Sequence, residues 1–223
     1  MSSSLAFDVY GTLIDPSDVI RQLRPRLAGE AEGFYRRWRD KQLEYSFRRG
    51  LMGAYVDFAQ CTREALAYLC AAEQAPLDEQ VQQQLCDAWT RLPAFADSAA
   101  GLAQLQQRGA QLYAFSNGSH AAVNALLEQA GLADFFREIV SVEAVGNFKP
   151  APAVYQYLLQ RTGSAAQATW LVSSNSFDIL GAAHAGLRSV WVKRAATAVL
   201  DPWGIDADLQ VSDLRQLAER WPG

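Results

Sequence analysis

Short apolar runs alternate with longer stretches of helical periodicity along most of the chain. The short runs are followed by polar or glycine-containing turns, as expected of buried parallel strands. In the longer stretches apolar residues recur every three or four positions, and glycine ends several of them, as at helix C-termini. This alternation predicts a parallel sheet with helices on both faces. The predicted strands are residues 4–10, 110–117, 137–142, 168–175 and 188–194, with a weaker sixth at 208–214; the predicted helices between them are 97–109, 119–132, 152–163 and 177–187.

Residues 16–93 have a different pattern, with helical periodicity and no convincing strand. The helical stretches are 19–29, 32–52, 56–73 and 78–92. This insert separates the first strand from the rest of the sheet, so we predict an α/β fold with two domains. Residues 1–15 and 94–223 form a Rossmann-like core, and residues 16–93 form a helical cap. Ligands bind at the carboxyl ends of the strands in such sheets, and a cap would close over that edge.

The composition narrows the possible partners. The 223 residues are 50% hydrophobic, and the 20 basic and 24 acidic residues give a net charge of −4 without a run of like charge. This balance disfavours nucleic acid and membrane surfaces as partners. The opening "MSSSLAFD" lacks the basic start and apolar centre of a signal peptide, and we find no apolar run long enough to span a bilayer. We therefore expect a cytoplasmic protein.

Cysteine and histidine offer little chemistry in this sequence. Cys61, Cys70 and Cys86 are an odd number without C-x-x-C spacing, and we interpret them as reduced core thiols. The two histidines, His120 and His184, lie outside any Ser/His/Asp or Cys/His arrangement and are expected on helix surfaces. The sequence has no G-x-S-x-G, P-loop or G-x-G-x-x-G motif, which disfavours serine hydrolases, nucleotide hydrolases and dinucleotide oxidoreductases.

Polar residues come directly after several predicted strands, at the edge where the carboxyl ends of the strands meet. The first strand, predicted within residues 4–10, ends at Asp8, and Lys149 lies in a loop before a helix that begins with proline. Two carboxylates, one cation and a row of small hydrogen-bonding residues therefore converge on one edge, which favours a catalytic site. The candidate residues are Asp8, Ser116, Asn117, Lys149, Ser173, Asn175 and Asp178.

These residues belong to motifs that resemble, in order and spacing, those of the L-2-haloacid dehalogenases of the haloacid dehalogenase superfamily. The resemblance covers nearly the whole chain. It implies hydrolysis of (S)-2-haloalkanoic acids to (R)-2-hydroxy acids and halide, through an ester on Asp8 with inversion at C2. It also implies a homodimer. The motifs are "FDVYGTLID", "WRDKQLEYSF" with "LMGAYVDF", "FSNGS", "NFKPAPAVY" and "VSSNSFD".

Two positions distinguish this chain from most of the superfamily. Most members resemble one another as magnesium-dependent phosphatases, with a second Asp two residues after the nucleophile and an acidic metal ligand in the fourth motif. Tyr10 and Ser174 stand at these positions. Because Mg²⁺ requires several oxygen ligands with compensating negative charge, we expect no metal and no other cofactor. A metal-dependent phosphatase is the less favoured alternative.

The resemblance implies a role for each charged residue. Asp8 attacks carbon while Thr12 and Lys149 restrain it, since a nearby lysine favours the ionised carboxylate; an isolated Asp here would merely cap a turn. Arg39 receives the departing halide. Alternatively, because other arginines lie beside it in the sequence, Arg39 belongs to a solvated basic face of the helix. Asp178 activates the water that hydrolyses the ester, and Ser173 and Asn175 position Asp178. Alternatively, Asp178 is a first-turn acid that interacts with the helix dipole.

The remaining candidates bind the substrate. Ser116 and nearby backbone N–H groups hold its carboxylate, and Asn117 assists Arg39 with the halide, although both residues also suit an ordinary turn. Tyr155 contacts the region of the lysine or belongs to the core. An apolar wall around the alkyl group, or ordinary core packing, explains Tyr10, Leu43, Phe58 and Phe177.

Departures from the usual pattern leave other substrates open. The stretch "LIDPSD" lacks the Phe that more often precedes the Asp, and "YSFRRG" stands where a Trp-Leu pair is usual. One alternative is the same displacement by Asp8 on another small carboxylate, such as a strained cyclic amino acid that opens. Another is a catalytically silent protein that binds a small acid.

Overall fold

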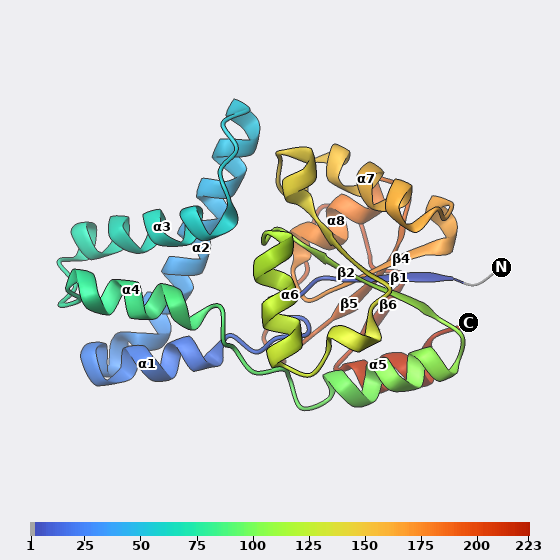
Figure 1. The fold of residues 1–223 in the computed structure, drawn as a ribbon, viewed down its shortest axis with the longest axis horizontal. Helices are drawn as coiled ribbons and strands as arrows, with labels where there is room; N and C mark the ends of the chain where they lie inside the picture. Colours follow the sequence, from blue (N-terminus) through green and yellow to red (C-terminus); the bar gives the residue numbers. More distant parts are fainter. Residues whose placement is uncertain (1–2) are drawn as a thin grey trace.

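The computed structural model describes residues 3–223. Six strands form one parallel sheet in the order β3-β2-β1-β4-β5-β6 (Figure 1). All of the predicted strands are present, and each is shorter than predicted, the sixth most of all. The strands are β1 (Ser4–Phe7), β2 (Gln111–Ser116), β3 (Glu138–Ser141), β4 (Thr169–Ser173), β5 (Arg188–Val192) and β6 (Leu209–Val211).

Helices cover both faces of the sheet, as predicted. Strand residues alternate between the faces, so β1 sends Leu5 and Phe7 into one apolar cluster and Ala6 into another. The first cluster contains residues of α5, α6 and α9, and the second contains residues of α7 and α8 (Figure 1). These helices are α5 (Ser98–Gln107), α6 (His120–Gln129), α7 (Pro152–Thr162), α8 (Ser176–His184) and α9 (Leu214–Arg220), with 3₁₀ turns at Ala133–Phe135, Val142–Val145 and Ala166–Ala168.

The helix α9 corrects the prediction for the C-terminal region. We expected residues 208–214 to form a strand and predicted no helix after it. The strand ends at Val211, and the Asp213 carboxylate accepts a hydrogen bond from Gln216 N at 2.8 Å, capping α9. A helix this short offers about two turns of periodicity, so an N-cap is its clearest signal.

The register of the sheet places the polar strand ends side by side. Phe7 of β1 is level with Ala114 of β2 and Val172 of β4. Asp8 continues the line of β1, because its N–H donates to Val172 O at 2.9 Å. The central strand therefore delivers Asp8 to the carboxyl edge between β2 and β4.

The insert after β1 is helical throughout, as expected. Its helices are α1 (Ser17–Leu27), α2 (Ala31–Met52), α3 (Phe58–Glu73) and α4 (Glu79–Ala88), with a 3₁₀ turn at Ala28–Glu30. They lie together to one side of the sheet (Figure 1). Asp57 and Asp78 cap α3 and α4 by accepting from backbone N–H groups.

Two short segments connect the insert to the sheet and pair with each other. Asp15 N donates to Pro93 O at 2.8 Å, and Phe95 N donates to Leu13 O at 2.9 Å. Ile14 and Ala94 form the antiparallel bridge between them. On this basis we keep, as a proposal, the division into a core of 1–15 and 94–223 and a cap of 16–93.

The cysteines and histidines lie largely as expected. All three cysteines are free, but only Cys61 is a fully buried core thiol, while Cys70 and Cys86 are partly exposed. Burial raises the pKa of each thiol to about 11. His120 and His184 are exposed at helix ends. Across residues 3–223, no helix combines the length and apolar character needed to cross a bilayer.

Candidate active site

The carboxylate of Asp8 is held by three donors from three segments of the chain. Its Oδ2 accepts hydrogen bonds from Thr12 Oγ1 and Asn175 Nδ2, both at 2.8 Å, and its Oδ1 accepts from Lys149 Nζ at 3.2 Å. The side chain is only 11% exposed. A carboxylate has about four lone-pair sites, so these bonds fix its orientation and leave one lone pair available for attack.

Lys149 is the buried cation that joins the two acids. Its ammonium group contacts Asp8, donates to Asp178 Oδ2 at 2.8 Å and donates to the Phe115 carbonyl at 2.8 Å. Its backbone N–H donates to Asn117 Oδ1 at 2.9 Å. Burial alone would lower the pKa of Lys149, but the charges of Asp178 and Asp8 outweigh it and raise that pKa. Lys149 therefore remains protonated.

Asp178 is fully buried at the start of α8. Besides Lys149, it contacts Tyr155, whose hydroxyl donates to Asp178 Oδ1 at 2.7 Å. Burial raises the pKa of Asp178 and the charge of Asp8 adds to this, while Lys149 and Tyr155 oppose it. Burial also raises the pKa of Tyr155 well above its ordinary value, so the phenol stays a donor. Asp178 is thus a carboxyl group that binds a proton more readily than a surface Asp.

The contacts of Ser173 and Asn175 differ from those that we expected. We predicted that both position Asp178, yet the Asn175 amide donates to Asp8. Ser173 Oγ accepts from Asn175 N at 3.1 Å and so acts on Asn175. Asn175 does contact Asp178 through its backbone, because its carbonyl accepts from Asp178 N at 3.1 Å, whereas the Asp178 side chain is held by Lys149 and Tyr155. The sequence places these residues at one strand end but does not show which carboxylate each one faces.

Gly181 is a site residue that sequence reasoning missed. A Cβ atom at this position would lie 2.3 Å from the Tyr155 hydroxyl oxygen and 2.6 Å from its Cζ. The absence of a side chain in α8 therefore lets the Tyr155 hydroxyl reach Asp178. The only sequence signal was a glycine inside a predicted helix, which often marks close packing.

Arg39 is not part of the solvated face to which its neighbours belong. Arg36 and Arg37 are exposed, and Arg37 pairs with Glu73 at 2.7 Å. Arg39 is partly buried, donates to Gln42 Oε1, and lies over the ring of Trp89 at 5.2 Å from its centroid. The structure therefore turns Arg39 away from that exposed face, toward Gln42 and Trp89.

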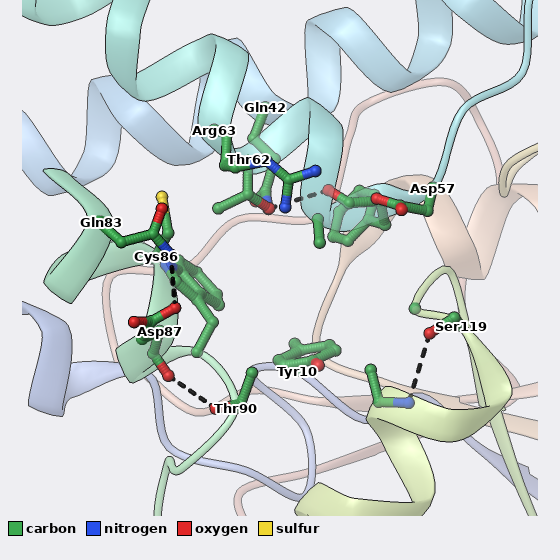
Figure 2. A pocket seen from close by; sticks show the side chains of 15 residues that line it. Tyr10, Gln42, Asp57, Thr62, Arg63, Gln83, Cys86, Asp87, Thr90 and Ser119 are labelled. Carbon is green, nitrogen blue, oxygen red and sulfur yellow. Dashed lines mark hydrogen bonds between the residues drawn. The ribbon is translucent and has the colours of Figure 1, made fainter. Parts of the chain in front are cut away.

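A cavity of about 160 Å³ lies between the insert and the loop after β2. Figure 2 shows Gln42 and Thr62 of the insert on one side of it and Tyr10 on the opposite side. Phe58, Trp89 and Gly118 also line it. Burial raises the pKa of Tyr10 to about 12, with opposing contributions from the charges of Arg39 and Asp8. Tyr10 thus lines the cavity and also lies close enough to Asp8 for the charge of that carboxylate to affect its pKa.

The other predicted binding residues have contacts of their own, and among them Phe58 also lines the cavity. Ser116 Oγ accepts from Gly118 N at 3.0 Å, which shapes the turn after β2. Leu43 packs against the second apolar cluster, and Phe58 is buried within it, with its ring 6.0 Å from that of Phe148. Phe177 is half-buried and contacts Phe47 at 5.4 Å between ring centroids.

The donors near Asp8 are a poor set for a divalent cation. Burial raises the pKa of Tyr10 to about 12, so its hydroxyl stays protonated at neutral pH, and Ser174 Oγ donates to Gly11 O at 2.8 Å. Lys149 occupies the space between the two carboxylates. Within the described residues no group of three or more His, Cys, Asp or Glu side chains is arranged to hold a metal ion.

Sequence comparison finds relatives along nearly the whole chain. The haloacid dehalogenase-like hydrolase family matches residues 4–186. An (S)-2-haloacid dehalogenase of Pseudomonas sp. (strain YL) is 37% identical over 215 residues, which cover 96% of this chain and 92% of that protein. A haloacetate dehalogenase H-2 of Moraxella sp. (strain B) is 33% identical, covering 93% and 92% of the two chains.

Structure comparison agrees with this. The L-2-haloacid dehalogenase from Xanthobacter autotrophicus superposes with a TM-score of 0.87 at 32% identity, over 98% of both chains. A second structure of that enzyme, equally similar, has chloropropionic acid covalently bound.

Proposed function

This chain belongs to the haloacid dehalogenase-like hydrolases, and from this membership we propose that it hydrolyses (S)-2-haloalkanoic acids to (R)-2-hydroxy acids and halide. The observation that carries the proposal is the buried cluster of Asp8, Lys149 and Asp178 at the carboxyl edge of the sheet. Asp8 is held in place with one lone pair free, and Asp178, which contacts the same lysine, has a raised pKa. A nucleophile and a base are thereby separated by environment.

The first step is displacement at C2 of the substrate. An oxygen of Asp8 attacks this carbon from the side opposite the halogen. An oxygen–carbon bond forms while the carbon–halogen bond breaks, and the halide leaves with the bonding electrons. The configuration at C2 inverts. Thr12, Asn175 and Lys149 hold the attacking carboxylate in position throughout.

The leaving halide and the substrate carboxylate need positive or hydrogen-bonding partners. Arg39, turned inward by its contacts, receives the halide. The Asn117 amide carbonyl is occupied by Lys149 N, which leaves its NH₂ group to assist Arg39. Ser116 and the backbone N–H groups of the adjoining turn bind the substrate carboxylate. Tyr10, Leu43, Phe58 and Phe177 form the apolar wall for the alkyl group.

The second step returns the enzyme to its starting state. Asp178 takes a proton from water, which adds to the carbonyl carbon of the Asp8 ester. The ammonium of Lys149 beside Asp8 stabilises the negative charge that develops. The bond between the acyl carbon and the substrate oxygen then breaks, and the departing alkoxide takes the proton held by Asp178. The new carboxylic acid at Asp8 loses its proton to solvent, so the Asp8 and Asp178 carboxylates are both restored.

A single turnover in heavy-oxygen water with enzyme in excess tests this route. The heavy oxygen should appear in the peptide that contains Asp8, because water attacks the enzyme carbonyl and not C2. With racemic 2-chloropropionate, only the (S) enantiomer should disappear, with one chloride released for each (R)-lactate formed. Label in the product alone would overturn the ester. Ring opening of a cyclic acid without halide release, or magnesium-stimulated phosphomonoester hydrolysis, would support the alternatives.

The rate of ester hydrolysis should depend on pH through Asp178. Asp178 acts as a base only when it is ionised, and its pKa is raised above 3.8. As the pH is lowered, the rate of ester hydrolysis should therefore begin to fall at a higher pH than it would with an ordinary Asp. Tyr155→Phe removes a hydrogen bond that lowers this pKa, so the acid limb should move to still higher pH. Rapid-quench measurement of ester decay across pH checks this, and coincident profiles for the two enzymes would contradict it.

The same shift affects stability with a defined sign. Since the pKa of Asp178 is raised on folding, its contribution to stability is complete below about pH 4 and is lost as the pH rises through the raised value. Lys149, whose pKa is also raised, contributes stability that is lost only as the pH rises through a value above 10.5.

The homodimer and the cytoplasmic location also belong to this proposal. Leu51 and Met52, at the end of α2, are 90% and 69% exposed, which suits a surface that meets another chain. The free thiols suit a reducing compartment.

A further inference from the structure

We propose that Gln42, Thr62 and Trp89 are positioning residues that hold the Arg39 guanidinium where the halide departs. This inference rests on the proposed function of Arg39. None of the three residues stands out by its position in the sequence. They come from three helical segments of the insert: α2, α3 and the end of α4.

The first support is a chain of hydrogen bonds that all run in one direction. Arg39 Nη1 donates to Gln42 Oε1, and Gln42 Nε2 donates to Thr62 Oγ1. Thr62 Oγ1 in turn donates to the Phe58 carbonyl at 2.9 Å. Each donor thereby strengthens the next.

The direction of this chain fixes the orientation of the Gln42 amide. The hydroxyl hydrogen of Thr62 is used by the Phe58 carbonyl, so toward Gln42 Thr62 can only accept. The NH₂ group of Gln42 must therefore face Thr62, which turns its carbonyl oxygen toward Arg39. A hydroxyl on α3 thus decides that the guanidinium of α2 meets an acceptor.

Burial makes this arrangement firm. Gln42 is 1% exposed and Thr62 is 5% exposed, so water does not compete for their polar atoms. The Thr62 carbonyl also accepts from Trp38 Nε1 at 2.9 Å, which ties the backbone of α3 to α2. The chain is therefore anchored at both helices.

Trp89 restrains the guanidinium from its flat side. The Arg39 Cζ atom lies 5.2 Å from the centre of the Trp89 ring, within the range of a cation–π contact. The ring is itself held by Trp38, edge-on at 5.8 Å, and by Tyr10 at 6.0 Å. Gln42 and Trp89 also line the cavity, so the guanidinium that they hold is positioned beside the space where a substrate would enter.

The neutrality of Gln42 preserves the charge of Arg39. A carboxylate at this position would also accept from Arg39, but it would neutralise the charge that the halide needs. A neutral amide orients the guanidinium and leaves its positive charge unpaired. The residues that hold Arg39 thereby keep it available for an anion.

The test compares Thr62→Val with Thr62→Ser. The valine removes the hydroxyl that orients Gln42, whereas the serine keeps it. Thr62→Val should slow formation of the Asp8 ester by roughly 10- to 100-fold with 2-chloropropionate and less with 2-bromopropionate, whose leaving group needs less help. Hydrolysis of the ester, once formed, should keep its rate. Thr62→Ser should stay within about threefold of the parent in both steps.

A second readout does not depend on activity. In NMR spectra of arginine-labelled protein, assigned by loss of the signal in Arg39→Lys, the Arg39 guanidinium should show restricted rotation in the parent and in Thr62→Ser, and free rotation in Thr62→Val. Gln42→Met should behave like Thr62→Val and replaces it if that variant does not fold. Restricted rotation in both Thr62→Val and Gln42→Met, or equal slowing of both chemical steps, would overturn the positioning role. If the parent shows restricted rotation but releases no halide, the proposed function fails and the positioning role stands.

Discussion

Replacing Asp8 by asparagine should reduce halide release from (S)-2-chloropropionate by about 10⁴-fold or more, as expected when a covalent nucleophile is removed. An amide oxygen carries no full negative charge and is a poor nucleophile toward carbon. Thr12 and Asn175 can still donate to the amide oxygen, and Lys149 keeps its ion pair with Asp178, so the fold should survive. Chloride release under saturating substrate measures the effect.

The matched control for this change is Asp134→Asn. Asp134 is exposed on a short 3₁₀ turn before β3, away from the cluster, and the same chemical change there should leave the rate unaltered. An Asp8→Asn variant that is folded and retains more than about a tenth of the parent rate would remove the nucleophile from the scheme.

Replacing Asp178 by asparagine should separate the two chemical steps. Ester formation does not need a base, so the enzyme should release up to one halide per active site and then stop. Hydrolysis of the ester should slow by about 10³-fold, within the usual range for loss of a general base. Intact-protein mass spectrometry after substrate addition should show the added mass of the acyl group, and peptide mapping should place it on the peptide that contains Asp8.

The environment of Asp178 makes this variant informative. Asparagine retains a carbonyl oxygen that can accept from Tyr155, while Lys149 keeps its ion pair with Asp8. Before it reacts, the variant therefore still pairs the buried lysine with one carboxylate, and this pairing is lost only when Asp8 becomes the ester. Loss of turnover without any accumulated adduct would assign Asp178 to the displacement step instead of the hydrolysis.

The positions of the candidate acids and lysine could be predicted from the sequence because the end of a strand is recognised from the few residues around it. A short apolar run between turns is typical of a buried strand, and the residue at its carboxyl end must lie at the edge of the sheet. Asp8 and Ser173 could therefore be placed without coordinates. Lys149 could be placed similarly, in the loop ahead of a helix that begins with proline. The positions of these residues in the structure match the predicted ones.

The pairings among these residues could not be predicted in the same way. Asn175 is three residues from Asp178 in the sequence, yet its amide contacts Asp8, because β4 lies beside β1 in the sheet. Gln42, Thr62 and Trp89 look like ordinary helix residues, since each acquires its role from a side chain on another helix. The need for glycine at position 181 becomes clear only from the structure, where the Tyr155 ring packs against it.

The pairing of residues 13–15 with residues 93–95 has a consequence for how this enzyme can change. The points of entry and exit of the helical insert are adjacent, so the insert is a cassette whose length can vary without rerouting the sheet. Exchange of the cassette would replace the helices of the insert together with Arg39, while Asp8 and Asp178 on the sheet keep their geometry. Under the proposed roles, the residues that receive the halide can therefore change while the two acids of the sheet stay in place.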